Sequence, residues 1–405
     1  MSAAHAVESP YAWSRLVVSL VLSTIGGVGM WSVVVALPAV QADFGVARGA
    51  ASLPYTMTML GFGAGSILTG RASDRFGIMP PLVVTSLALA AGFALASRAP
   101  TLGFYAAAQG LLIGFGSSAT FSPLLAHMSQ WFDRRRGIAV AVVASGNYLA
   151  GAVWPPIVQH FIAAQGWRPT YLGIGIFCAL TMVPLALLFR TPPPAHGSQA
   201  ARSTVRRREE PPLGVPGPTL QRLLTVAGLC CCVAMSMPQV HLVAYCSDLG
   251  YGPARGAQML SVMLACGVVS RIGFGLVSDR IGGLRTLLLG SLLQGIALVL
   301  FLPFDGLVSL YVVSALFGLF QGGIVPSYAI IIRDYFPARE AGARVGIVIT
   351  ATLLGMALGG YLSGAIFDWT GSYRAAFING IAFNLANLSI VVWLLRRRAL
   401  RAAFA

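Results

Sequence analysis

Apolar stretches long enough to cross a lipid bilayer recur along the whole chain and restrict what it can fold into. Of the 405 residues, 57% are hydrophobic and only 10% are charged, whereas about a quarter of the residues in a soluble domain are charged. A hydrocarbon core of about 30 Å is crossed by about 20 residues of α-helix. Backbone groups in lipid must be bonded within the protein, and these stretches are too long for barrel strands. The sequence therefore predicts an all-α membrane protein.

Twelve transmembrane helices are expected, arranged as two pseudo-symmetric six-helix bundles. The first should stay in the protein, because its apolar stretch (16–42) is too long for a removable signal peptide. A segment rich in proline, serine and charge, typical of a flexible linker, separates the bundles. The predicted domains are the N-terminal bundle (1–189), the cytoplasmic linker (190–219) and the C-terminal bundle (220–405). The predicted spans are residues 15–38, 50–70, 80–98, 102–128, 137–163, 167–190, 220–246, 255–276, 285–303, 307–331, 343–367 and 374–395.

The basic residues predict how the chain sits in the membrane. The 27 basic residues outnumber the 12 acidic ones, all of them are arginine, and most fall in segments that share one side of the membrane. The positive-inside rule then places both termini in the cytoplasm. We expect a multi-pass protein of the plasma membrane, the inner membrane in a bacterium. Its positive charge would face anionic lipid headgroups of the bilayer rather than nucleic acid.

The two halves of the chain repeat each other. The sequence GRASDRFG (70–77) returns as GLVSDRIG (275–282), 205 positions later. The sequence GFGSSATFSPLLAHMSQWF (114–132) likewise matches GLFQGGIVPSYAIIIRDYF (318–336) in an early glycine, a serine-proline neighbourhood and a closing aromatic-Phe pair. Internal repeats of this kind are typical of transporters whose substrate site lies between the halves.

Twelve spans, a long central loop and a repeated Gly-x-x-x-Asp-Arg-x-Gly turn resemble the major facilitator superfamily. The resemblance covers nearly the whole chain and implies alternating access, with the two turns acting as conformational latches on the cytoplasmic side. Charged groups at a helix junction can make bonds that one conformation keeps and another breaks. Ile78 and Met79 stand where the family has a basic pair. The latch residues are Gly70, Asp74, Arg75 and Gly77 in the first turn and Gly275, Asp279, Arg280 and Gly282 in the second.

A narrower resemblance is to the monocarboxylate transporter family and its bacterial relatives. The segment WFDRRRGIAVAVVASGNYLAG (131–151) has that family's aromatic-Phe pair, Arg-rich turn and Gly-x(4)-Gly face, and YAW (11–13) and VHLVAYCSDLGY (240–251) are also similar. The resemblance implies a small carboxylate as substrate, bound by an arginine on span eight. The motif positions are filled by Trp131, Phe132, Arg134, Arg136, Ala139, Gly146 and Gly151.

Charge within the predicted spans indicates the same site. All 12 acidic residues fall in loops or at span ends, whereas Arg271 lies inside span eight, eight residues before Asp279. That is about 12 Å along a helix, close to the middle of the membrane. The counterpart of Arg271 in the first half is Ser66. A buried guanidinium usually faces a cavity and has a partner. The simplest partner is a substrate carboxylate that accepts two parallel hydrogen bonds, and the alternatives are backbone carbonyls at a helix break or snorkelling to the interface.

The proton-coupling residues of the animal carriers are missing from the matching positions, which argues against proton symport by that route. Where those carriers have an aspartate one turn before the arginine, this chain has Gly267, and their first-span lysine falls near Pro38. His241 in span seven is the candidate for a co-transported proton or for the anion, and the alternative is a neutral, hydrogen-bonded interface histidine. Further cavity candidates, each also compatible with packing alone, are Phe121, Asn147, Tyr148, Gln321 and Tyr328.

These features predict a monomeric secondary active transporter, a symporter or exchanger, for a small organic anion. A single cation within the membrane favours a monocarboxylate. The alternatives are an exchanger of dicarboxylates or aromatic acids, a drug exporter and a non-transporting anion sensor. Enzymatic activity is not expected, because the spans offer neither a nucleophile with its base nor paired carboxylates, so no catalytic residue is predicted. Neither a cofactor nor a metal site is expected, since no cysteine pair has zinc-ligand spacing.

Overall fold

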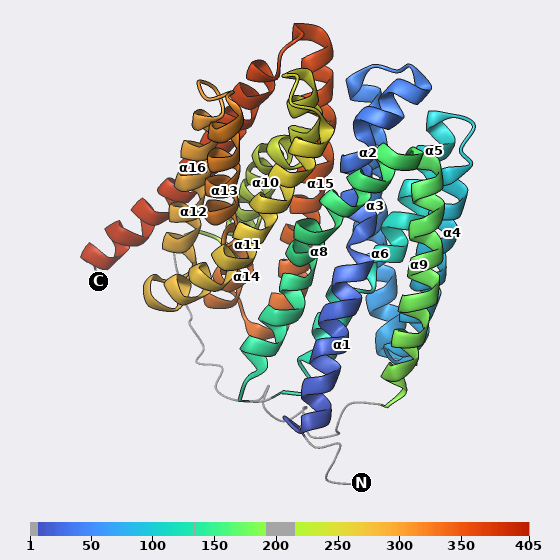
Figure 1. Cartoon of the computed structure of the whole chain (residues 1–405). Helices are drawn as coiled ribbons and strands as arrows, with labels where there is room; N and C mark the ends of the chain where they lie inside the picture. Colours follow the sequence, from blue (N-terminus) through green and yellow to red (C-terminus); the bar gives the residue numbers. More distant parts are fainter. Residues whose placement is uncertain (1–6, 133, 192–214, 405) are drawn as a thin grey trace.

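Two six-helix halves lie side by side in the computed structural model, which describes residues 7–132, 134–191 and 215–404. Over these residues the chain is helical and has no β-strand. Figure 1 shows the N-terminal half in blue to green beside the C-terminal half in yellow to red. Most of the predicted linker (190–219) lies outside the described residues. The predicted fold class is confirmed.

The helices of the N-terminal half follow one another with short connections. They are α1 (Pro10–Gly26), α2 (Val28–Phe44), α3 (Arg48–Phe76), α4 (Met79–Ser97), α5 (Leu102–Ala108), the π-helix η2 (Gln109–Gly114), α6 (Phe115–Ser118), α7 (Ser122–Met128), α8 (Arg136–Gln165), α9 (Trp167–Leu187) and the short 3₁₀ turn η3 (Leu188–Arg190).

The C-terminal half has fewer interruptions. Its helices are α10 (Gly217–Asp248), α11 (Pro253–Ile281), α12 (Gly283–Leu300), α13 (Leu307–Gln321), α14 (Ile324–Tyr335), α15 (Ala338–Thr370) and α16 (Tyr373–Phe404).

Eleven helical segments of the described chain are long and apolar enough to cross a membrane. They correspond to eleven of the twelve predicted spans. The remaining one, predicted span two, corresponds to α3. This helix is long enough at 29 residues, but its many small polar residues and its charged ends lower its hydropathy. α3 instead packs between other helices, against α15 of the other half and against η2 of its own.

Three of the spans are broken rather than continuous. Span one divides at Gly27 between α1 and α2, span four divides at residues 119–121 between α6 and α7, and span ten divides at residues 322–323 between α13 and α14. The breaks in spans four and ten fall at matching places in the sequence repeat. Irregular backbone at membrane depth is tolerated where it is buried in protein or lines a cavity, so these breaks are candidate places for a binding site.

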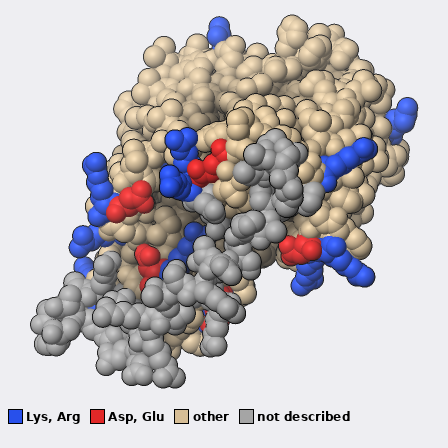
Figure 2. Space-filling view, turned by 90° about the horizontal axis from the view of Figure 1, so that it is seen from below, with Lys and Arg blue, Asp and Glu red and all other residues tan. Residues whose placement is uncertain are grey.

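The two ends of the molecule differ. We call the end at which η3 and α10 flank the linker the linker end, and the opposite end, where α2 joins α3 and α15 joins α16, the far end. The linker end is the lower one in Figure 1. Seen from that end, Figure 2 shows many arginine side chains, several beside acidic ones, on an otherwise largely uncharged surface.

Two antiparallel helix pairs, α3 with α15 and α8 with α11, join the halves. Toward the far end, a Cβ atom added to Gly364 of α15 would lie 2.9 Å from the Arg48 carbonyl oxygen, and one added to Gly360 would lie 3.0 Å from the Tyr55 ring. Toward the linker end, a Cβ atom on Gly70 of α3 or on Gly346 of α15 would meet nothing within 4 Å. The halves therefore touch closely at the far end and separate toward the linker end.

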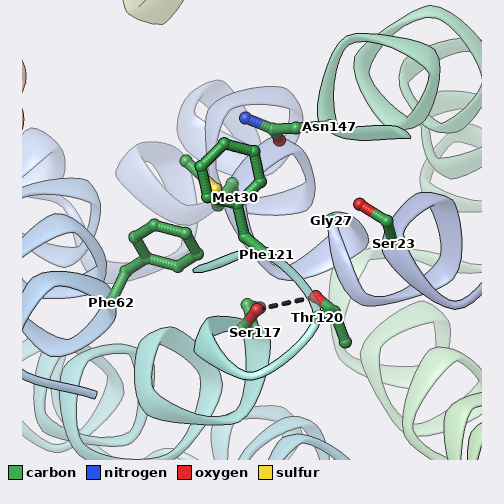
Figure 3. A pocket seen from close by; sticks show the side chains of 8 residues that line it. All are labelled: Ser23, Gly27, Met30, Phe62, Ser117, Thr120, Phe121 and Asn147. Atoms are coloured by element: carbon green, nitrogen blue, oxygen red, sulfur yellow. Dashed lines mark hydrogen bonds between the residues drawn. The ribbon is translucent and has the colours of Figure 1, made fainter. Parts of the chain in front are cut away.

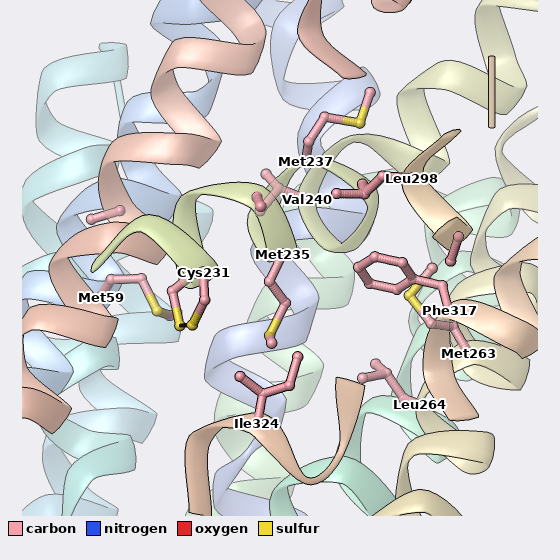
Figure 4. Close-up of a cluster of buried hydrophobic side chains, with 14 of the residues drawn as sticks. Met59, Cys231, Met235, Met237, Val240, Met263, Leu264, Leu298, Phe317 and Ile324 are labelled. Atoms are coloured by element: carbon pink, nitrogen blue, oxygen red, sulfur yellow. Dashed lines mark hydrogen bonds between the residues drawn. The ribbon is translucent and has the colours of Figure 1, made fainter. Parts of the chain in front are cut away.

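The core of the C-terminal half extends across this contact. Figure 4 shows Met59 of α3 beside Cys231 of α10, next to a cluster that includes Met235, Phe317 and Ile324. The N-terminal half has a second core of its own, built on large buried aromatic side chains such as Trp131 and Tyr105. Shared apolar packing holds the far end of the interface together, because it removes apolar surface of both halves from their surroundings.

Candidate functional site

Arg271 lies on α11, at the contact with α8 of the other half. Its Nη1 donates a hydrogen bond to the Ala144 carbonyl oxygen at 3.0 Å, and its Cζ lies 4.5 Å from the centre of the Tyr148 ring. Its buried Nε has no hydrogen-bond partner. Within the described chain no carboxylate pairs with it. The guanidinium therefore keeps hydrogen-bonding capacity that protein groups do not use.

The carbonyl partner of Arg271 does not mark a helix break, because Ala144 lies well inside α8. A carbonyl that already belongs to a helical ladder is a weak partner for a cation compared with a carboxylate. The contact reaches across the interface between the halves. Any change in the separation of α8 and α11 will therefore change the surroundings of this side chain.

Tyr148 occupies the space beside Arg271 because Gly267 has no side chain. A Cβ atom on Gly267 would lie 2.5 Å from Cδ1 and 2.6 Å from Cε1 of the Tyr148 ring. Only glycine leaves room for the ring at this separation of α8 and α11. The ring in turn covers the guanidinium face in a cation–π contact. Tyr148 thus fills the place that an acidic side chain at position 267 would occupy.

The break between α13 and α14 rests on the turn of α11 that carries Arg271. The backbone N–H of Gly322 donates to the Ser270 hydroxyl at 3.1 Å. A Cβ atom on Gly322 would lie 2.8 Å from the backbone nitrogen of Arg271. Gly322 and Gly323 therefore let an interrupted helix approach α11 closely. Interrupted helices are the elements from which many transporters form their substrate sites.

A small cavity in the N-terminal half gathers two of the predicted cavity residues, Phe121 and Asn147. Its volume of about 10 Å³ holds about one water molecule. Figure 3 shows Phe121 beside Met30 and Asn147, with the Phe62 ring 6.1 Å from that of Phe121. The Asn147 Oδ1 has no hydrogen-bond partner. The lining residues are Ser23, Gly27, Met30, Phe62, Ser117, Thr120, Phe121 and Asn147.

The remaining candidates make hydrogen bonds of their own. Gln321 accepts a hydrogen bond from Gln239 at 2.7 Å. Tyr328 is fully buried and donates to Asn387 Oδ1 at 3.1 Å. His241, also fully buried, lies 3.0 Å from the Tyr373 hydroxyl and 2.8 Å from the Gly360 carbonyl oxygen. Three of the seven predicted binding residues thus form other contacts within the C-terminal half.

The two repeated turns close α3 and α11 at the linker end. Gly77 and Gly282 follow these helices with φ angles of 78° and 81°. Residues other than glycine rarely adopt such angles. Asp74 and Asp279 are exposed, and neither makes an ion pair with another described residue. The turns are present as predicted, and their carboxylates are disengaged in this conformation.

The two glycines of the motif in α8, Gly146 and Gly151, allow close packing. A Cβ atom on Gly146 would lie 2.5 Å from the Ser23 hydroxyl oxygen, so α1 and α8 touch at this point. Gly151 faces the ring of Trp31 and, across the interface, Leu264. The motif that resembles the monocarboxylate family therefore places α8 against α1 on one side and against α11 on the other.

Sequence reasoning missed a charged cluster at the far end. Arg48, only 7% exposed, forms two hydrogen bonds of 3.0 Å with the Asp248 carboxylate of the other half. Asp368 accepts hydrogen bonds from the backbone of Arg48 and Gly49. The acidic residues are predicted in loops and at span ends, and those within the described residues lie there. Nothing in the sequence indicated that residues so far apart would meet.

Arg15 is a second buried arginine that the sequence did not single out. It is 4% exposed in α1 and lies under the rings of Trp131 and Phe189. Its Nη2 lies 3.0 Å from His127 Nε2. Because the residue stands at a predicted span boundary, its burial under aromatic rings followed only from the packing of α1 against α7.

Comparisons with known proteins agree with this geometry. A profile of the Major Facilitator Superfamily matches residues 19–307 and 224–404. Monocarboxylate transporter 13 of Rattus norvegicus is 31% identical over 353 residues, which cover 85% of this chain and 78% of that protein. Its Bos taurus counterpart is 29% identical over 360 residues, covering 85% and 79%. A solved bacterial homologue of the human lysosomal transporter Spinster has a TM-score of 0.69 at 13% identity, covering 97% of this chain and 96% of that one, and so shares the fold.

Proposed function

Because the chain belongs to the major facilitator superfamily and is related to its monocarboxylate transporters, we propose that it carries a small monocarboxylate across the plasma membrane by alternating access. Arg271 binds the carboxylate in this proposal. The observation that carries it is a guanidinium at the interface between the halves with an unpartnered Nε and no carboxylate partner in the described chain. The substrate would supply the missing acceptor.

The proposed binding event replaces a weak contact by a stronger one. The Ala144 carbonyl oxygen accepts from Arg271 Nη1 in this conformation. A carboxylate can accept two parallel hydrogen bonds from the guanidinium, with charge assistance in a poorly solvated place. Tyr148 keeps the guanidinium plane oriented through its ring contact and is proposed as a positioning residue. Gly267 leaves the space that the ring requires.

One cation at the site supports a monoanion as the substrate. The two arginines that are fully buried in the described helices lie elsewhere, Arg15 beside Trp131 and Arg48 at the far end. A dicarboxylate would need a second cation to offset the cost of placing its other charge inside the membrane. We propose that the linker end is cytoplasmic, so that both termini and the arginine-rich surface of Figure 2 face the cytoplasm.

The test is uptake of labelled lactate, pyruvate and succinate into proteoliposomes. Arg271→Ala is expected to lower monocarboxylate uptake by about 100-fold or more, because a charged hydrogen-bond partner is lost. Arg271→Lys should retain a fraction, since it keeps the charge without the planar fork. Arg255→Ala is the matched control, because Arg255 is an exposed arginine of the same helix.

Two outcomes would overturn parts of the proposal. Undiminished monocarboxylate uptake by Arg271→Ala would remove Arg271 from the site, and preference for succinate would replace the monocarboxylate by a dicarboxylate. The same vesicles with an imposed inward proton gradient test coupling. Stimulated uptake supports symport with a proton, whereas unchanged uptake supports exchange or uniport.

A further inference from the structure

A salt bridge between the halves stands at the far end. Arg48, the first residue of α3, donates from Nη1 to Asp248 Oδ2 and from Nη2 to Asp248 Oδ1, both at 3.0 Å. Asp248 is the last residue of α10, in the other half. A two-point bond of this kind fixes direction as well as distance. The Arg48 guanidinium also lies 4.7 Å from the centre of the Phe367 ring.

A chain of hydrogen bonds extends this salt bridge into the C-terminal half. Arg48 Nη1 donates to the Tyr373 hydroxyl at 2.7 Å. Because the Gly360 carbonyl can only accept, His241 carries its proton on Nε2 and donates to it at 2.8 Å. Nδ1 of the neutral ring then accepts from the Tyr373 hydroxyl at 3.0 Å. His241 thus holds Tyr373 in the orientation that receives Arg48.

A second carboxylate of the C-terminal half caps the start of α3. Asp368 Oδ1 accepts from the backbone N–H of Arg48 at 2.8 Å, and Oδ2 accepts from that of Gly49 at 2.7 Å. The first N–H groups of a helix have no partner within the helix, and the helix dipole favours a negative charge there. α15 therefore supplies the N-terminal cap of a helix in the opposite half.

The sequence repeat gives the salt bridge a counterpart that stays within one half. Asp43 and Asp248 correspond at an offset of 205. In the N-terminal half, Asp43 pairs with Arg168, the second residue of α9, at 2.8 Å. The second residue of α16 is also an arginine, Arg374, yet Asp248 pairs with Arg48 of the other half. A contact that lies within one bundle in the first half thus joins the two bundles in the second.

The pair α3 and α15 carries the same ending at both of its ends. α3 ends Asp74-x-x-Gly77 at the linker end, and α15 ends Asp368-x-x-Gly371 at the far end. The two helices are antiparallel, so each aspartate stands at the end where the other helix begins. In this conformation Asp368 caps its partner helix, whereas Asp74 makes no ion pair with a described residue and the glycines near it face open space.

We propose that Arg48, Asp248 and Asp368 form a far-end lock, and that this lock alternates with the Asp74 turn during the cycle. Closing one end of the α3–α15 pair brings one aspartate onto the partner helix and withdraws the other. The two engaged states therefore exclude each other, which is what alternating access requires of its gates. The proposal does not depend on which substrate Arg271 binds.

The lock is tested by distance measurements between spin labels in lipid nanodiscs without substrate. Labels at Arg98→Cys and Phe304→Cys report the far end, since both residues are exposed there in opposite halves. Labels at Phe76→Cys and Ala343→Cys report the linker end, where α3 ends and α15 begins. The unsubstituted protein, labelled in parallel, gives the background from its own cysteines, five of which are buried.

Asp248→Asn is expected to raise the ratio of far-end-open to far-end-closed molecules at least tenfold, because it leaves the buried Arg48 without its counter-ion. Asp368→Asn should raise it about fivefold, the usual effect of losing a helix cap. In both variants the linker-end labels should move closer together. Adding Asp74→Asn to Asp368→Asn should return the ratio toward that of the parent.

Asp43→Asn is the matched control, because it breaks a far-end salt bridge that lies within one half. Its distance distributions should equal those of the parent. Unchanged distances in both Asp248→Asn and Asp368→Asn would overturn the lock, as would an equal shift in Asp43→Asn. If Asp74→Asn and Asp368→Asn shift the ratio in the same direction, the alternation is wrong. Size-exclusion profiles show whether each variant is folded. If one lock variant fails to fold, the other decides the question.

Discussion

The two helix pairs that join the halves, α3 with α15 and α8 with α11, are counterparts in the sequence repeat, yet they carry different chemistry. α3 corresponds to α11 and α15 to α8, at an offset of 205 through the repeated turns. In the middle of these helices, Arg271 of α11 corresponds in the sequence repeat to Ser66 of α3. At the far end, Asp368 of α15 stands opposite Ala163 of α8.

This difference separates two tasks that one repeat would otherwise duplicate. The α8–α11 pair holds a cation at the interface, with Tyr148 packed over it. The α3–α15 pair holds a carboxylate at each end, of which Asp368 caps the start of α3 and Asp74 is exposed and disengaged. A symmetric arrangement would place two cations in the middle of the membrane, at an added desolvation cost. Under the two proposals, substrate binding and gate closure belong to different copies of one scaffold.

The largest expected effect comes from making the middle of α11 resemble α3. Arg271→Ser gives α11 the residue type that α3 has at this position. We expect saturable monocarboxylate uptake to fall by about 100-fold or more, because the charged hydrogen bonds to the substrate disappear. Initial rates in proteoliposomes measure it. Uptake within about threefold of the parent would show that Arg271 does not give the middle of α11 a function that the middle of α3 lacks.

A smaller but clear effect is expected from filling the open end of the α3–α15 pair. A Cβ atom on Gly346 would meet nothing within 4 Å in this conformation, so Gly346→Leu should leave the thermal midpoint close to that of the parent. The added side chain would block closure of the linker end, and uptake should fall about tenfold. Gly364→Leu is the opposite case, since the Arg48 carbonyl oxygen and Gly49 Cα would both lie 2.9 Å from its Cβ.

Gly364→Leu should therefore lower the thermal midpoint, by the equivalent of about 1–3 kcal/mol for an overpacked contact. Differential scanning fluorimetry in detergent compares the two variants directly. Equal midpoints would contradict the unequal closure of the two ends.

A third prediction concerns the space beside the cation. Gly267→Ala places a methyl group 2.5 Å from the Tyr148 ring, so the ring must move away from Arg271. We expect KM for the substrate to rise about tenfold with a smaller change in the maximal rate. In a Tyr148→Ala background the same substitution should cost little, because the collision is gone. Purely additive effects in this double-mutant cycle would contradict a direct coupling of the two positions.

The smallest effect is expected from copying the far-end cap onto the other pair. Ala163→Asp gives α8 the same Asp-x-x-Gly ending that α15 has. A carboxylate near the start of α11 should favour the far-end-closed state by about 0.3–1 kcal/mol, a shift of two- to fivefold. The spin-label pair at Arg98 and Phe304 measures it. A shift toward the open state would show that α8 and α11 meet in a different register at this end.

The elements followed from the sequence because their signals are local. The helices and the two Gly-bounded turns each depend on residues within about 20 positions, where hydropathy and glycine conformation act directly. The place of Arg271 inside α11 followed from a simple count along one helix. The helix α3 was correctly predicted, although its hydropathy leaves it outside the eleven apolar spans.

The candidate site was only partly predictable. Tyr148 lies beside Arg271, and Asn147 and Phe121 line a small cavity of the N-terminal half. The other three candidates, Gln321, Tyr328 and His241, are hydrogen-bonded to other residues of the C-terminal half. A polar residue on a glycine-interrupted helix can face either the interface or its own bundle. Helical periodicity alone does not distinguish the two, since the faces are separated by packing rather than by hydropathy.

The sequence by itself determined the membrane helices, the duplication and the place where the duplication fails at Arg271. The tertiary structure alone decided which charges meet. Arg48 and Asp248 are 200 residues apart, and Arg48 and Asp368 are 320 apart. Their contact depends on how closely two bundles approach at one end, and that approach is fixed by glycines, shared apolar packing and the conformation that the halves adopt. Such distances are properties of the assembled interface, so no local pattern in the chain could have specified them.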